Sequence, residues 1–256
     1  MSSKKGKIMN INIVNIVTAL AAALLGYFVG AIPTGIIIGK VFFHKDIREY
    51  GSGNSGGTNA GRVLGKKIGL LVIILDMLKS VLVVYVVWAI TTFAGLKEYY
   101  LFADAPKIFQ DLRPLYYWMA LLFSAIGHCY SIYLKFSGGK AASAFMAMST
   151  MTSWLGFAVG FFYLATLKFR KMVSYAALIG GLPEVLAAWI IFIVQMTTGF
   201  QISFFSYTFF LGEDAVIWGL WYAISITVVY LLMAFRHKSN IQRIKEGTER
   251  KITWMK

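Results

Sequence analysis

Cysteine is almost absent from this chain of 256 residues, since Cys129 is the only one. A single thiol excludes an intramolecular disulfide, and no cysteine–histidine pattern has the spacing of a zinc motif. Acidic residues are also few, 11 in all, and they form no aspartate cluster of the kind that holds a catalytic metal ion. We therefore expect neither a metal ion nor another cofactor. A metal-dependent CDP-alcohol-type phosphotransferase is disfavoured for the same reason.

Charge of either sign is scarce as well. Charged residues make up 14% of the chain, where a water-soluble domain has about a quarter. Long runs nearly free of charge recur along the whole length, which predicts an all-α, polytopic transmembrane helix bundle formed by a single domain, residues 1–256. The first run, Ile8–Phe43, is too long for a signal peptide and lacks a small-residue cleavage site, so we expect it to be retained.

Five membrane spans are clear in the sequence: Ile13–Phe42, Leu64–Phe93, Pro114–Leu134, Val173–Gln195 and Asp214–Phe235. Residues 1–12 form an expected N-terminal tail, and residues 236–256 form a C-terminal motif and tail. The stretch Ala141–Leu167 decides the topology, because it crosses the membrane either once or as two short helices broken near Ser149–Ser153.

The distribution of basic residues favours the second arrangement. With two crossings, the basic segments 40–67, 135–140, 168–171 and 236–256 share one membrane side, together with most of the 25 lysine and arginine residues. Short helices at membrane depth are tolerated when they pack inside protein. We expect about seven helices, two of them short, with the N-terminus outside and the C-terminus in the cytoplasm. The lysines near the N-terminus argue against this orientation.

A glycine-rich polar segment, GSGNSGGTNAGR at residues 51–62, lies between the first two spans. Glycine lets backbone amides approach an anion closely and permits positive φ. Arg62 adds a planar cation suited to a phosphoryl group. Neutral donors come from Ser52, Asn54, Thr58 and Asn59. From composition, the segment is either one wall of an anion site or a flexible linker between helices.

A second polar segment, GHCYSIYLKFSGGK at residues 127–140, follows the third span. Gly138 and Gly139 offer bare backbone amides, and Lys140 follows them at the start of the next helix, an arrangement that suits an anion. His128 titrates near neutrality and is a candidate general acid or base. The alternative is an interfacial histidine beside a glycine turn.

A third polar segment, RHKSNIQRIKEGTER at residues 236–250, leaves the last span. His237 and Asn240 are three residues apart and share one face of a helix. Arg236, Arg243 and Arg250 are candidates for further phosphate contacts. The alternative is a juxtamembrane polybasic segment that binds anionic lipid.

Two charged features lie inside the expected spans. Asp76 and Lys79 are three residues apart in the second span, so a structural ion pair that faces the bundle interior is the first expectation. Glu184 follows Pro183 in a later span and has no obvious partner in the sequence.

The three polar segments, in this order, resemble the motifs of the bacterial acyl-phosphate:glycerol-3-phosphate acyltransferases. The first is similar to S-G-N-x-G-x-T-N-x-x-R, which residues Ser52 to Arg62 match at every fixed position. The second is similar to G-H-x-[FY]-P-x-[FY]-L-x-F-x-G-G-K-G, with Ser131 and Ala141 in place of the proline and the last glycine. The third is similar to R-H-x-x-N-I-x-R-[LI]-x-x-G-x-E, and it ends at Glu249.

Further features extend this likeness and limit it. Asp76 and Lys79 fit a D-x-x-K-G motif of the family, with Ser80 in place of the glycine. The chain is longer than typical members at the N-terminus, near Leu96–Arg113 and near Thr198–Glu213. The departures touch backbone shape more than chemical groups, so they bear on acyl-chain preference more than on the reaction.

The resemblance implies a multi-pass enzyme of the bacterial plasma membrane whose active site faces the cytoplasm. It would transfer a fatty acyl group from acyl phosphate to the 1-hydroxyl of glycerol 3-phosphate, giving lysophosphatidic acid and phosphate as the first step of phospholipid synthesis. The expected partners are these two substrates and membrane lipid, without nucleic acid. The rival class is a membrane transporter or binding protein for an organic phosphate. Polar groups that gather at one face disfavour a transporter.

Two phosphates held side by side require cations and amides from several segments. The candidates for the acyl-phosphate headgroup are Ser52, Arg62 and Lys140, with the amides of Gly138 and Gly139. The candidates for glycerol 3-phosphate are Asn54, His237 and Asn240. The remaining candidates for substrate binding are Thr58, Asn59, Ser137, Arg236, Arg243 and Glu249. The general base is His128, His237 or a substrate phosphate oxygen, and the helices around Ala141–Leu167 would form a groove for the acyl tail.

Overall fold

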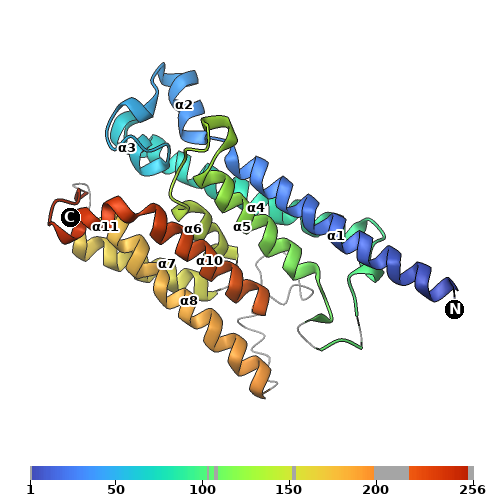
Figure 1. Ribbon diagram of the computed structural model, residues 1–256. Helices are drawn as coiled ribbons and strands as arrows, with labels where there is room; N and C mark the ends of the chain where they lie inside the picture. The colour runs from blue at the N-terminus through green and yellow to red at the C-terminus, as the bar shows by residue number, and fades with distance from the viewer. Residues whose placement is uncertain (1, 103, 107–108, 152–153, 199–218, 253–256) are drawn as a thin grey trace.

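The computed structural model describes residues 2–102, 104–106, 109–151, 154–198 and 219–252. Within these residues the regular structure is helical, apart from two isolated bridges that join Leu101 to Asp111 and Ser131 to Ser137. Figure 1 shows long helices packed side by side, with the two chain termini at opposite ends of the molecule. The prediction of an all-α bundle is confirmed.

The first expected span is two helices, α1 (Ser2–Ala31) and α2 (Thr34–Phe43). The chain breaks at Pro33, which has no amide hydrogen and disfavours helical geometry in the residue before it. Helix α1 already begins at Ser2, so the segment 1–12 that we expected as a tail belongs to the helix from its second residue on.

Helix α1 packs along α5 (Arg113–Cys129), and α4 (Lys66–Phe93) packs against both. Small residues make the closest of these contacts. A β-carbon added at Gly26 would lie 2.1 Å from the carbonyl oxygen of Ala120, and one at Gly30 would lie 2.2 Å from that of Ser124. Close backbone approach at glycine is a common way for helices to pack in membranes, where the hydrophobic effect does not drive helices together.

Part of the extra segment near 96–113 is described, and its first turn contacts α1 and α4. A short 3₁₀ turn, η2 (Lys97–Tyr99), precedes Tyr100, whose side chain is fully buried and whose carbonyl accepts the amide of Leu112 at 3.1 Å. The second extra segment, near 198–213, lies outside the described residues after Thr198.

The ambiguous stretch Ala141–Leu167 forms two helices, α6 (Ala142–Met151) and α7 (Trp154–Arg170). Helix α7 packs against α6. The two backbones approach closely at Gly156, where an added β-carbon would lie 1.8 Å from the carbonyl oxygen of Ser149. After α7 the chain turns into α8 (Val173–Thr198), and Lys171 accepts the amide of Ile252 at 2.7 Å. The basic segment 168–171 therefore lies beside the C-terminal segment, as the two-helix interpretation requires.

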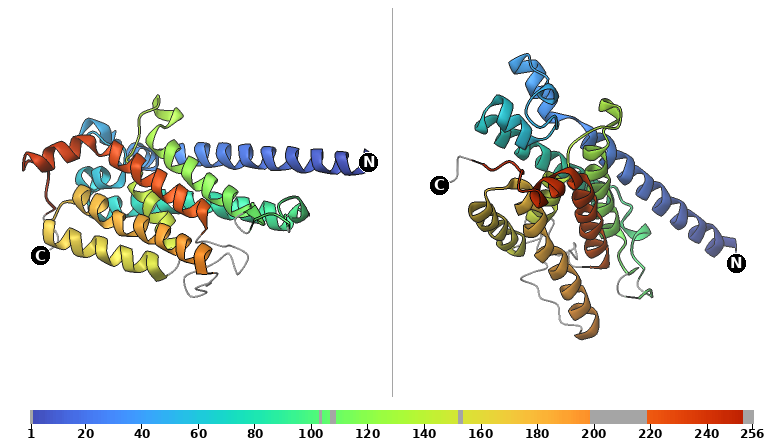
Figure 2. Two further views of the ribbon diagram at one scale, coloured as in Figure 1. Left: turned by 60° about the horizontal axis from the view of Figure 1, so that its bottom comes forward. Right: turned by 60° about the vertical axis from the view of Figure 1, so that its left-hand side comes forward.

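Helix α10 (Leu220–Arg236) packs against α8, as α7 does. Figure 2 shows α7, α8 and α10 running alongside one another. The start of the expected span Asp214–Phe235 lies outside the described residues up to residue 218.

Between α6, α8 and α10 the buried Glu184 carboxylate accepts hydrogen bonds from Ser149 and, at 2.6 Å, from the Tyr222 hydroxyl. Glu184 therefore has the partners that the sequence did not reveal. The chain then bends by 60° into α11 (Lys238–Lys245).

Three helical stretches of the described residues are long and apolar enough to cross a membrane: Ile11–Phe43, Lys66–Phe93 and Val173–Thr198. A fourth is added if α10 and α11 count as one bent span. Helices α5, α7 and α10 have 17 residues each, slightly short of the usual ~20. The count of seven membrane helices and the sides on which the termini lie stay predictions.

Candidate functional site

The first polar segment folds around Asn59, which lies on α3 (Gly57–Leu64) and is 1% exposed. Its side-chain nitrogen donates to the carbonyls of Ile47, Tyr50 and Asn54 at 2.7, 3.2 and 2.9 Å. Its oxygen accepts the amide and the hydroxyl of Ser52 at 2.7 and 3.0 Å. The Asn59 amide therefore holds the loop and binds the Ser52 hydroxyl. Asn59 also lines the cavity described below, and its role in substrate binding stays a prediction.

The second polar segment packs closely against the end of α5. The Gly139 amide donates to the His128 carbonyl at 2.8 Å, so it is engaged within the protein and is not the bare anion donor that we expected. A β-carbon on Gly139 would lie 1.9 Å from His128 Nε2, and one on Gly138 would lie 2.3 Å from the His128 carbonyl oxygen. The two glycines are needed because only a bare backbone fits over His128.

Arg236 joins the second segment to the third. Its guanidinium donates to the carbonyls of Gly138 and Gly139 at 3.0 and 3.1 Å and lies over the ring of Tyr130, 5.1 Å from its centroid. Asn54 donates to the same Gly138 carbonyl at 3.4 Å. Arg236, expected to contact phosphate, thus holds the loop that carries Lys140.

The third polar segment is organised by Glu249, which is 8% exposed. Its carboxylate accepts hydrogen bonds from Ser174 and Asn240, both at 2.7 Å, and from Arg243 at 2.8 Å. Burial opposes ionisation of Glu249, but these three donors outweigh it and the pKa of the carboxyl lies below its usual value. An ionised Glu249 therefore orients Asn240 and Arg243 at neutral pH.

These segments enclose a polar cavity of about 110 Å³. Its lining includes predicted side chains from all three segments, among them Ser52, Asn54, Arg62, Lys140 and His237. Beside it lies a wider basin of about 490 Å³, which Arg62 and Lys140 also line, together with Arg243 and Arg250. The sequence prediction that the three segments form one site is consistent with this arrangement.

Two cations face this cavity. Lys140 Nζ donates to the side-chain oxygen of Asn240. Burial, together with the positive charge of Arg243, lowers the pKa of Lys140 to about 8. Arg62 forms no hydrogen bond or ion pair with the other described residues, and burial near Arg250 lowers the pKa of its guanidinium. Cations placed at such a cost in desolvation are suited to an anionic ligand.

His237 lines the same cavity and caps α10. Its Nδ1 lies 2.8 Å from the Met233 carbonyl, and because a carbonyl only accepts, this nitrogen carries the proton. Burial lowers the pKa of His237 to about 4, so the ring is neutral at pH 7. Its Nε2 is therefore a hydrogen-bond acceptor.

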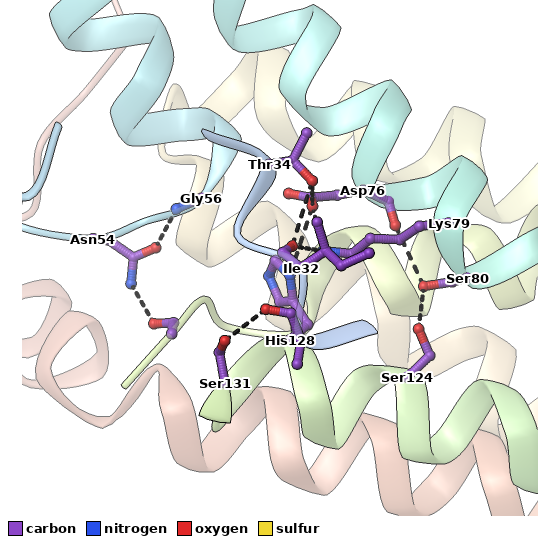
Figure 3. Close-up of polar contacts among 12 residues, drawn as sticks. Ile32, Thr34, Asn54, Gly56, Asp76, Lys79, Ser80, Ser124, His128 and Ser131 are labelled. Atoms are coloured by element: carbon purple, nitrogen blue, oxygen red, sulfur yellow. Dashed lines mark hydrogen bonds and ion pairs between the residues drawn. The ribbon is translucent and has the colours of Figure 1, made fainter. Parts of the chain in front are cut away.

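Charged side chains also gather where the break between α1 and α2 meets α4 and α5 (Figure 3). Lys79 Nζ lies 2.7 Å from Asp76 Oδ1 and donates to the Ile32 carbonyl at 2.7 Å, and the Thr34 hydroxyl donates to Asp76 at 2.9 Å. The predicted ion pair is confirmed, and it satisfies polar groups that the helix break exposes. His128 Nδ1 lies 3.5 Å from Lys79 Nζ, so the imidazole is enclosed between this pair and Gly139.

An apolar cavity of about 370 Å³ adjoins the polar one. The two share the side chains of Ala142, Met146, Tyr163 and Ala177. The apolar cavity runs between α6, α7 and α8, on the helices that we expected to hold an acyl tail.

Comparisons with known proteins agree with this arrangement. A family model described as glycerol-3-phosphate acyltransferase matches residues 20–247. A glycerol-3-phosphate acyltransferase of Staphylococcus haemolyticus is 34% identical over 234 residues, 91% of this chain and 96% of the relative. The chain belongs to the glycerol-3-phosphate acyltransferase family. A further member, from Listeria monocytogenes serovar 1/2a, is 34% identical over 241 residues, 93% of this chain and 99% of its own.

The fold is also that of a solved member of the glycerol-3-phosphate acyltransferase family. The crystal structure of PlsY, an integral membrane glycerol 3-phosphate acyltransferase, in its glycerol 3-phosphate form aligns with a TM-score of 0.67 and 24% identity, and covers 92% of this chain and 96% of that one. Its lysophosphatidic acid form aligns with a TM-score of 0.66 and 23% identity. The chain therefore has the fold of a membrane-embedded protein.

The predicted site residues divide into three groups by position. The cavities are lined by most of them: Ser52, Asn54, Thr58, Asn59, Arg62, His128, Lys140, Arg236, His237, Asn240, Arg243 and Glu249. Gly138 and Gly139 pack against His128 at the end of α5. Ser137 is exposed and donates to the Leu134 carbonyl at 2.7 Å, so the structure gives it a turn contact instead of a place in the cavity.

Sequence reasoning did not assign the polar residues Ser174 and Asp76 to the site. Ser174 donates to Glu249, and Asp76 lines the cavity wall as well as pairing with Lys79. Ser174 carries no motif signal beyond its place directly after the basic segment 168–171. Asp76 was noticed, but only as half of an ion pair.

Proposed function

We propose that this protein transfers a fatty acyl group from acyl phosphate to the 1-hydroxyl of glycerol 3-phosphate. The observation that carries the proposal is the junction of two cavities with opposite character. A polar cavity lined by Arg62, Lys140 and His237 adjoins an apolar one, and the two share four lining residues. An acyl phosphate has the same division, a dianionic head on an apolar tail.

The proposed chemistry needs little more than positioning and charge stabilisation. The hydroxyl oxygen of glycerol 3-phosphate forms a bond to the acyl carbonyl carbon, and the bond from that carbon to the phosphate oxygen breaks. Lys140 and Arg62 stabilise the charge that develops on the leaving phosphate, which is where fixed cations contribute most. The hydroxyl proton passes to His237 Nε2 or to a phosphate oxygen of the substrate. His128, held between Lys79 and Gly139, positions the loop that carries Lys140.

We also propose that the site faces the cytoplasm of a bacterium, at the plasma membrane. Basic residues of all four segments gather at this end of the molecule, and the positive-inside rule associates such an excess with the cytoplasmic side. Glycerol 3-phosphate would then reach the cationic basin from water, while the acyl donor arrives within the bilayer.

The donor is tested by reconstituting the purified chain in liposomes with labelled glycerol 3-phosphate. We expect lysophosphatidic acid to form from hexadecanoyl phosphate and not from hexadecanoyl-CoA. Unphosphorylated glycerol serves as the matched acceptor control and should give no product. Product from acyl-CoA alone, or uptake of glycerol 3-phosphate without acylation, would contradict the proposal and, in the second case, favour the transporter.

The reaction should weaken in alkali. The lowered pKa of Lys140, about 8, means that its positive charge is present below pH 8 and is lost as the pH rises through that value. We therefore expect kcat/KM to fall above about pH 8, since this parameter reports the ionisation of the free enzyme. The measurement is a pH profile of kcat/KM from pH 6.5 to 10, with Lys140→Arg as control, because arginine stays charged over this range. An identical alkaline limb in that variant would assign the fall to another group.

A further inference from the structure

The apolar cavity has one wall position that packing does not explain, namely Gly160 on α7. A β-carbon added there would have no described residue within 4 Å, although Gly160 lines the cavity. Its backbone is helical, so it needs no positive φ. Glycine is less favourable than alanine inside a helix. A side chain at position 160 would therefore occupy cavity space that glycine leaves free.

Other glycines of the same cavity contrast with this one. A β-carbon on Gly156 would lie 1.8 Å from the carbonyl oxygen of Ser149, and one on Gly180 would lie 3.0 Å from the α-carbon of Tyr163. One on Gly181 would lie 3.1 Å from the ring of Phe145. These three glycines permit contact between helices, whereas Gly160 leaves room that no other described residue fills.

The order of residues along α7 places Gly160 midway along the cavity. Tyr163 lines both cavities and so marks the end next to Lys140, while Gly156, level with Ser149, marks the far end. Gly160 lies one helical turn from each, about 4.5 Å beyond Tyr163 along the axis. Exposed Phe161 and Leu164 form the outer rim, so the cavity is open sideways toward the region where lipid lies.

We propose that Gly160 determines which acyl-chain lengths the cavity accepts. The occupant is the tail of the acyl donor, because the cavity is apolar, is open at its rim and adjoins the cationic cavity. A tail that enters beside Tyr163 must pass Gly160 before it reaches Ser149 and Thr150 at the far end. This inference rests on the proposed donor and adds the residue that limits its length.

The test substitutes Gly160→Leu and measures kcat/KM with acyl phosphates of 10 to 18 carbons in the reconstituted system. Each methylene that loses its place in the cavity should lower kcat/KM about fourfold. We expect hexadecanoyl phosphate to fall at least about tenfold and decanoyl phosphate to stay within about twofold of the unmodified protein. Gly160→Ala should shift the profile in the same direction by less.

A matched control places the same leucine side chain on α7 away from the cavity. Ala165 lies on α7 but does not line the cavity, so Ala165→Leu should leave the chain-length profile unchanged. Equal losses with short and long donors in both Gly160 variants would overturn the inference, as would a profile that does not shift. Failure of the unmodified protein with every acyl phosphate would overturn the proposed donor instead, and with it the assignment of the tail.

Discussion

Lys140→Met should lower kcat/KM by about 10²- to 10³-fold, the size expected when one preorganised charge donor is removed from the group that develops negative charge. Lys140 lies where the polar cavity, the basin and the Asn240 side chain meet. No other lysine lines either cavity within the described residues, so no second ammonium takes its place. The measurement is steady-state kinetics with each substrate varied in turn.

Two controls separate charge from packing in this variant. Methionine keeps most of the length of the lysine side chain. The midpoint of thermal unfolding in detergent should therefore change only by the effect of the lost hydrogen bond to Asn240. Lys140→Arg restores the charge with a different shape and should recover part of the activity. Turnover near that of the unmodified protein in Lys140→Met would contradict the phosphate site.

Gly139→Ala is the second change with a large expected effect. The added β-carbon would lie 1.9 Å from His128 Nε2 and 2.6 and 2.7 Å from its Cδ2 and Cε1 atoms, so the ring or the loop must move. The ring is backed by Lys79, and the loop carries Lys140 and is held by Arg236. Overpacking of this kind destabilises proteins by about 1–3 kcal/mol, and displacement of Lys140 should also lower kcat/KM by at least about tenfold.

A double-mutant cycle tests the cause. His128→Ala removes the ring that alanine at 139 would meet, so the destabilisation by Gly139→Ala should be much smaller in that background. The readout is the midpoint of thermal unfolding for the two single variants and the double variant. Additive shifts would contradict the contact between Gly139 and His128.

The sequence alone identified the class of protein and most of its membrane helices. Expected and observed bounds agree closely for the helices Lys66–Phe93 and Val173–Thr198. An apolar run is a local property, and so is the ion pair between Asp76 and Lys79, which lie three residues apart on one helix. The break at Pro33 was also readable from proline chemistry, although we predicted a continuous span there. Spaced motifs added the family and a list of polar residues.

Only the tertiary structure shows what each of those polar residues contacts. The sequence shows that Asn59, Gly139 and Arg236 can donate hydrogen bonds, but it does not show that their acceptors are carbonyls of the protein itself. Likewise, Lys140 meets Asn240 across 100 residues of chain. Gly160 differs from Gly156 only in what lies in front of it. Hydrogen-bond partners and empty space are set by helices distant in the chain, and neither composition nor periodicity contains that information.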